Sequence, residues 1–259
     1  MTAVALETDG LTVRFGGVHA LEGVSVSVPQ GAIYGLVGPN GSGKTTLLNA
    51  VSGFVPATGQ VLLLGHSISR WAPSRRAAHG LGRTFQTPKI SRNLSVWELL
   101  RIGDHLRREQ PWWKVALTPW LAHQEELRMR ARGAAVLESL GVSPALIDAR
   151  VLSLAQGVIK MIDVARAVIA EPRVLLLDEP TAGMNEVEIQ NLRARLKQLN
   201  DSGLTIVIVE HNIRFLVGVC TEVSVLNLGR KLCDGTPDEV FRRQDVVDAY
   251  LGEEEVARA

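Results

Sequence analysis

One segment near the start of the chain restricts its fold more than any other. Residues 32–37 form a continuous apolar run, which is typical of a β-strand covered on both faces. The run leads directly into GPNGSGKTT, which matches G-x-x-x-x-G-K-[ST] and precedes an apolar, helix-like segment. Glycines let the backbone curl so that consecutive N–H groups point at one anion, and the following helix directs its positive end there. The segment therefore predicts a strand–loop–helix unit that binds phosphate.

The side chains of this loop predict which phosphates it holds. Lys44 is placed to reach the β- and γ-phosphates of a nucleotide, and the Thr45 hydroxyl is placed to ligate Mg²⁺. A purely structural glycine loop is the alternative, but the strand before the motif and the helix after it are the context that phosphate binding requires. The predicted nucleotide contacts are Gly38, Pro39, Asn40, Gly41, Ser42, Gly43, Lys44, Thr45 and Thr46.

The remaining chain predicts an α/β fold with a mostly parallel sheet. The first third is β-rich, with expected strands at 4–7, 11–15, 24–28 and 61–64. Residues 94–140 are rich in Arg, Leu, Glu and Ala and predict a helical insert, with Pro111 and Pro119 bracketing a break. The last third alternates strand and helix, which indicates βαβ units. Its expected elements are strands at 174–177, 205–209 and 223–228 and helices from about 186 and 213, the first capped by Asn185 and Glu188.

Composition excludes several classes of protein. Lys and Arg total 28 against 27 Asp and Glu, so the net charge of +1 gives no global reason to bind nucleic acid. Two cysteines are too few for a disulfide framework. No apolar stretch approaches the roughly 18 residues of a membrane span, and the acidic N-terminus is unlike a signal peptide. These features predict a protein of a reducing, cytosolic compartment.

A pair of carboxylates about 130 residues after the phosphate loop forms the second constellation. Asp178 and Glu179 follow the apolar run 174–177, so they are expected at the carboxyl edge of the sheet, beside the phosphate loop. Asp178 would hold Mg²⁺ and Glu179 would polarise an attacking water. Two acids after a strand are more often a helix cap or a surface pair, and only the phosphate loop reverses that interpretation.

The order of these motifs resembles the nucleotide-binding subunit of ATP-binding cassette (ABC) transporters over essentially the whole chain. The resemblance implies an antiparallel β subdomain, a P-loop NTPase core (1–86 and 172–253), a helical subdomain (87–171) and an acidic tail (254–259), with ATP and Mg²⁺ as cofactors. It implies that Phe15 stacks on adenine. It also implies that Gln86, in RTFQ, senses Mg²⁺ and attacking water, and that His211, in VIVEHN, contacts the γ-phosphate.

The signature segment departs from the family pattern LSGGQ. The preferred alignment places it on residues 154–158, with Ala155 in place of serine and Val158 in place of glutamine, while Gly157 is kept. The family serine bonds the γ-phosphate held by the opposite subunit, so Ala155 removes one charge-assisted hydrogen bond worth about 1.5–3 kcal/mol. The ATP site that uses this signature is expected to be weakened but not abolished. Asn185 also stands where the family commonly has aspartate.

The AGMN loop, the long helical region and the simple C-terminal end resemble the ATPases of branched-chain amino acid importers and their urea and amide relatives. The resemblance implies a second ATPase subunit, with a heterodimer favoured and a homodimer possible, together with permease subunits and, indirectly, an extracytoplasmic binding protein. It implies a peripheral position on the cytoplasmic face of the bacterial membrane. A weakly hydrolysing regulatory subunit is the alternative, and a soluble cassette acting on DNA or ribosomes is disfavoured because the chain has no basic tract.

Three tryptophans fall close together in the helical insert. Trp112, Trp113 and Trp120 either form an edge that touches a membrane subunit or lipid headgroups, or pack an irregular loop onto the helical subdomain. The packing interpretation is favoured.

Overall fold

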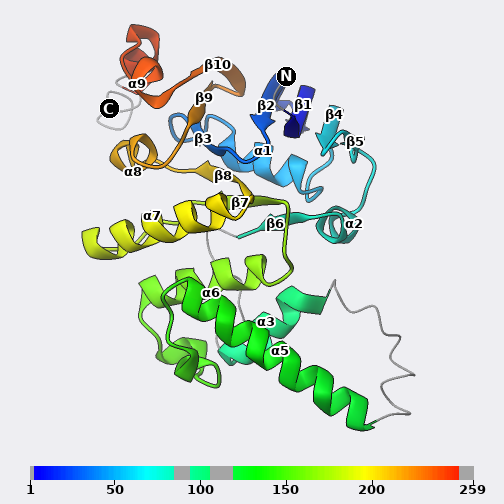
Figure 1. Cartoon of the computed structure of the whole chain (residues 1–259). Helices are drawn as coiled ribbons and strands as arrows, with labels where there is room; N and C mark the ends of the chain where they lie inside the picture. Colours follow the sequence, from blue (N-terminus) through cyan, green and yellow to red (C-terminus); the bar gives the residue numbers. More distant parts are fainter. Residues whose placement is uncertain (1–2, 85–93, 106–118, 251–259) are drawn as a thin grey trace.

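The computed structural model describes residues 3–84, 94–105 and 119–250, and the side chains of 119–122 are not described. Gln86, Trp112, Trp113 and the acidic tail lie outside the described residues, and Trp120 is described only as part of a helix. Figure 1 shows two sheets in the upper part of the molecule and a group of helices below them.

The N-terminal sheet is antiparallel, as expected, and has the strand order β2-β1-β4-β5. The two strands expected at 4–7 and 11–15 are in fact one strand. Gly10 has φ 59°, and the pairing register with β2 shifts between Thr8 and Leu11, so the strand bends at a bulge without ending. The members of this sheet are β1 (Val4–Phe15), β2 (Val18–Pro29), β4 (Thr58–Leu63) and β5 (His66–Ser67).

The second sheet has the order β10-β9-β3-β8-β7-β6 and is parallel except for the β9–β10 hairpin. Every residue of β3, β7 and β8 is buried, because helices or the other sheet cover both faces. This arrangement confirms the predicted mostly parallel sheet. Its strands are β3 (Ile33–Val37), β6 (Leu81–Arg83), β7 (Val174–Asp178), β8 (Thr205–Val209), β9 (Glu222–Asn227) and β10 (Arg230–Gly235).

The parallel sheet separates two hydrophobic cores, because alternate side chains of each strand point to opposite faces. In β7, Val174 and Leu176 pack with the N-terminal sheet and α1 (Lys44–Val51), whereas Leu175 and Leu177 pack with the helices of the other face. The helices that flank the sheet are α2 (Pro73–Ala78), α7 (Glu186–Asp201), α8 (Ile213–Val217) and α9 (Pro237–Val240). The parallel sheet is therefore supported by an apolar core on each face.

The predicted start of α7 is confirmed. The Asn185 side chain accepts the Glu188 N–H at 3.0 Å, and the Glu188 carboxylate accepts the Asn185 N–H at 2.8 Å, which closes a capping box. One apolar stripe of the helix faces the core, with Ile189, Leu192 and Leu196 buried. Local sequence therefore determines where this helix begins and which face it buries.

The predicted helical insert is present in the lower part of Figure 1. Within the described residues it contains α3 (Val96–Asp104), α5 (Pro119–Ser139) and α6 (Gln156–Val168), with short 3₁₀ turns at Pro144–Leu146 and Val151–Ser153. Pro119 begins α5, which fits the break expected before it, and Pro111 lies outside the described residues. Across the described ranges no helix is both long enough and apolar enough to cross a bilayer.

Candidate functional site at the carboxyl edge of the parallel sheet

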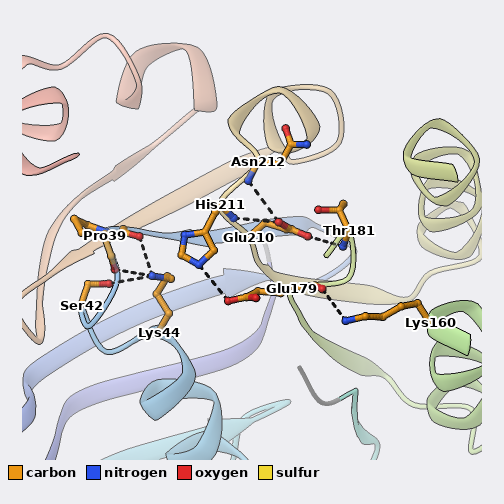
Figure 2. A network of polar contacts seen from close by, with 10 residues as sticks. Pro39, Ser42, Lys44, Lys160, Glu179, Thr181, Glu210, His211 and Asn212 are labelled. Carbon is orange, nitrogen blue, oxygen red and sulfur yellow. Dashed lines mark hydrogen bonds and ion pairs between the residues drawn. The ribbon is translucent and has the colours of Figure 1, made fainter. Parts of the chain in front are cut away.

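The phosphate loop connects β3 to α1, as predicted. Gly43 has φ 102° at the N-cap of α1, and a Cβ at Gly38 would lie 2.0 Å from the Leu226 carbonyl oxygen, so both positions require glycine. The Lys44 ammonium donates to the carbonyl oxygens of Gly38 at 2.8 Å and Pro39 at 2.7 Å, which holds it over the loop (Figure 2). The loop also rests on the β9–β10 turn, where the Gly229 N–H donates to the Ser42 carbonyl at 3.1 Å.

Asp178 lies at the end of β7 and is 2% exposed. Its Oδ2 lies 3.4 Å from an Arg83 guanidinium nitrogen, while its Oδ1 makes no hydrogen bond within the described residues. Burial raises the pKa of Asp178, and the positive charge of Arg83 opposes that shift. The same burial lowers the pKa of Arg83.

These groups fit a Mg²⁺ site of the kind that keeps phosphate and water among its ligands. Asp178 offers an unused buried oxygen and the half-buried Thr45 offers a hydroxyl, and Mg²⁺ prefers such hard donors. Among the described residues no three His, Cys, Asp or Glu side chains gather closely enough to hold a metal by themselves. Asp178 and Thr45 therefore supply two of the oxygen donors that a Mg²⁺ ion would need.

Glu179 and His211 meet although they follow different strands. β7 and β8 are adjacent and parallel, so the loops after them open at the same edge. Glu179 Oε1 lies 3.1 Å from His211 Nε2, and Lys160 of α6 donates to the Glu179 carbonyl oxygen at 3.1 Å (Figure 2). Glu179 adopts φ 48°, which is uncommon for a residue with a side chain. Carboxylate and imidazole are thus held next to each other at the edge that carries the phosphate loop.

Three other predicted site residues, Phe15, Ala155 and Gly157, are not part of the polar network drawn in Figure 2. Phe15 ends β1 and is 53% exposed. Ala155 is the N-cap of α6 and Gly157 lies in its first turn, where a Cβ would meet the Glu188 carboxylate at 2.2 Å. The network in Figure 2 reaches α6 through Lys160 and includes neither Ala155 nor Gly157. Within this chain the predicted signature therefore packs against the start of α7.

Three further residues belong to the site although no sequence motif marked them: Arg83, Lys160 and Glu210. Glu210 is 3% exposed and directly follows the buried strand β8, just as Glu179 follows β7. An acidic residue directly after an apolar strand was a usable signal for Glu210. Lys160 and Arg83 carried no such signal, because their partners lie 19 and 95 residues away in the chain.

A cavity of about 180 Å³ lies between the sheet-containing part and the helical part. Its lining includes Arg83 at the end of β6, and Phe54 and Ile102, which are 53% and 55% exposed. Arg166 of α6 crosses this junction by donating to the Arg83 carbonyl oxygen at 3.0 Å. A cavity lined by apolar side chains and by Arg83 and Arg166 therefore lies at the junction between the two parts.

Comparison with known proteins agrees with this geometry. The family model described as ABC transporter matches residues 21–182, and the model described as Branched-chain amino acid ATP-binding cassette transporter matches residues 230–256. Among solved structures, the chain is similar to the ADP conformation of MJ1267, an ATP-binding cassette of an ABC transporter, with a TM-score of 0.84 and 31% identity over 97% of this chain and 100% of that one. It is also similar to a nucleotide-free ATP-binding cassette, with a TM-score of 0.83, 29% identity and coverage of 95% and 98%.

Curated relatives align over almost the full length. The chain is 31% identical to BraF of Pseudomonas aeruginosa and 32% identical to LivG of Escherichia coli, over 98% of this chain and 100% of each relative. It is 34% identical to a probable LivG of Archaeoglobus fulgidus, over 95% of both chains. All three are described as branched-chain amino acid transport ATP-binding proteins. These matches confirm the resemblance that the order of motifs indicated, and the chain therefore belongs to the ABC transporter family as one of its ATP-binding cassettes.

Proposed function

We propose that the chain hydrolyses ATP with Glu179 and His211 and thereby powers an importer whose transport path lies in separate permease subunits. The observation that carries this proposal is the 3.1 Å contact between the Glu179 carboxylate and the His211 imidazole, at the edge from which the phosphate loop also emerges. The contact supports the proposal because it holds a carboxylate, which can act as general base, next to an imidazole, which can stabilise the γ-phosphate.

Each side chain of the site has a role in this proposal. Lys44 releases its loop carbonyls to bind the β- and γ-phosphates, and Glu179 orients the attacking water. Asp178 and Thr45 would hold Mg²⁺, whose positive charge neutralises phosphate oxygens when it is bound. Gln86 would sense the metal and the water, and Phe15 would stack on adenine through its exposed ring.

A second ATPase subunit completes the site. In this proposal the N–H of Gly157 and the start of α6 face the γ-phosphate held by the opposite subunit, as the signature does in the family. Ala155 caps α6 without a side-chain hydrogen bond, which supports a weakened second site. That asymmetry favours a partner with a different sequence, so we propose a heterodimer rather than a homodimer.

The substrate proposed for the importer is a branched-chain amino acid. Support comes from the full-length similarity to BraF and LivG and from the C-terminal family match at 230–256. Urea or short amides remain the alternative that the AGMN loop allows. The cavity near Phe54 and Ile102 supports docking of a permease segment there, which would place the chain on the cytoplasmic face of the membrane.

The test is ATP hydrolysis by the full chain, alone and assembled with the membrane subunits that co-purify with it. Glu179→Gln should bind nucleotide as tightly as wild type but lose at least about 100-fold in kcat, because an amide cannot accept a proton from water. Glu222→Gln, on the exposed start of β9, is the matched control and should keep wild-type activity. If wild type hydrolyses ATP slowly and Glu179→Gln hydrolyses it at the same rate, the chain is instead the weakly hydrolysing regulatory subunit that Ala155 suggests.

A further inference from the structure

The buried carboxylate of Glu210 has no ionic partner in the described part of the molecule. It is 3% exposed at the end of β8, and the ion pairs among the described residues do not include it. Burying a charge is unfavourable unless hydrogen bonds compensate it.

Backbone N–H groups compensate this charge. Glu210 Oε1 accepts the Thr181 N–H at 2.6 Å, and Oε2 accepts the N–H groups of His211 at 3.1 Å and Asn212 at 3.5 Å (Figure 2). Thr181 belongs to the loop after β7, whereas His211 and Asn212 belong to the loop after β8. One carboxylate therefore joins the two loops.

Those two loops carry the proposed hydrolytic pair. Glu179 lies two residues before Thr181, and His211 directly follows Glu210. Glu179 has φ 48°, a conformation that is unfavourable for a residue with a side chain and is kept by the surrounding bonds. Its own N–H is held by the Val209 carbonyl at 2.9 Å and its carbonyl by Lys160, while Glu210 holds the next N–H along the loop.

An amide in place of the carboxylate would not make the same bonds. An ionised carboxylate accepts at both oxygens, whereas glutamine accepts at one and donates at the other. In Glu210→Gln one end of the side chain would direct an NH₂ group at a backbone N–H. The loop on that side would lose its anchor while the volume of the side chain stayed almost unchanged.

We propose that Glu210 is a positioning residue for ATP hydrolysis, which acts by holding the Glu179 loop and the His211 loop at the separation that brings their side chains together. The inference rests on the proposed function, because it assigns hydrolysis to Glu179 and His211. Glu210 itself does not touch the nucleotide. Its effect passes through the contact between the two other side chains.

A double-mutant cycle tests the proposal on the full chain. Hydrolysis of Mg²⁺-ATP is measured under single-turnover conditions with protein in excess, so that slow variants remain measurable, and binding is measured with a fluorescent ATP analogue. Glu210→Gln is made in the wild-type and His211→Ala backgrounds, with Glu222→Gln as the control for loss of an acidic residue. Glu210→Asp retains the charge but is one methylene too short to reach both loops, and it replaces Glu210→Gln in the cycle if that variant does not fold.

The proposal expects Glu210→Gln to lower the hydrolysis rate about 10- to 100-fold in the wild-type background and less than about 3-fold in the His211→Ala background. Nucleotide affinity should change less than about 3-fold in both.

The positioning role of Glu210 would be overturned by equal rate losses in the two backgrounds, by a parallel loss of nucleotide affinity, or by wild-type rates in Glu210→Asp. If Glu179→Gln is inactive while Glu210→Gln is not, only this inference fails. If Glu179→Gln hydrolyses ATP normally, the proposed function fails first.

Discussion

Replacing Gly157 with alanine places two physical effects in opposition, and the structure determines which one is larger. Alanine in a helix is favoured over glycine by roughly 0.5–1 kcal/mol. The new Cβ, however, would lie 2.2 Å from Glu188 Oε1, well inside the 3.4 Å at which ordinary contact begins. The Glu188 carboxylate must therefore move by about 1.2 Å, and we expect this movement to disrupt the 2.8 Å bond that its other oxygen accepts from the Asn185 N–H.

Loss of this hydrogen bond costs about 0.5–1.5 kcal/mol, and crowding around the new methyl group adds to the cost, while the Asn185 side chain still caps the helix. We therefore expect Gly157→Ala to lower the free energy of unfolding by about 1 kcal/mol, which corresponds to a fall in Tm of roughly 2–4 °C. In a Glu188→Ala background the clash and the Glu188 bond to the Asn185 N–H are both absent, while the Asn185 side chain still accepts the N–H of residue 188. There the same substitution should stabilise the chain by the helix-propensity term alone, so its sign reverses.

The assay is thermal and urea unfolding of the nucleotide-free chain, followed by circular dichroism. Glu186→Ala is the matched control, because Glu186 lies in the same first turn of α7 but bonds Gln190 instead of the capping residue. In that background Gly157→Ala should still destabilise. An effect of the same sign in the Glu188→Ala and wild-type backgrounds would refute the reasoning.

Two further predictions concern the cap of α6 and a buried phenol. Ala155→Ser supplies a hydrogen-bond acceptor at an N-cap that lacks one, so it should raise the free energy of unfolding by about 0.5–2 kcal/mol. It should also raise ATP-dependent dimerisation or turnover. Unchanged dimerisation and turnover would show that Ala155 does not weaken the ATP site. Burial raises the pKa of Tyr34 to about 12, against the opposing effect of its 2.7 Å bond with Ser224. Because the folded pKa lies above the unfolded value of about 10, the contribution of the neutral phenol is complete below pH 10 and is lost as the pH rises toward 12. Urea unfolding across this interval should show wild type losing about 2–3 kcal/mol more stability than Tyr34→Phe, and parallel pH profiles for the two proteins would contradict the assignment.

Local patterns predicted the parts of the site that depend on neighbouring residues in the chain. The glycines and Lys44 of the phosphate loop, the carboxylates after β7 and the Asn185–Glu188 cap all follow from chemistry within a few residues. The β1 bulge at Gly10 was missed, because a glycine between two apolar runs also fits a turn between separate strands. β6 was missed because three residues are too few for a pattern.

The sequence by itself determined that this chain binds nucleotide phosphates on an α/β core and belongs among the ABC ATPases, because glycine conformations, strand burial and motif order are properties of the linear chain. Only the tertiary structure decided which groups meet. The order β3-β8-β7 brings His211 beside Glu179, and the same adjacency lets Glu210 join their loops. The packing of α6 against α7 likewise brings Gly157 to Glu188. Such contacts arise from strand order and helix packing across tens of residues, and no local pattern encodes them.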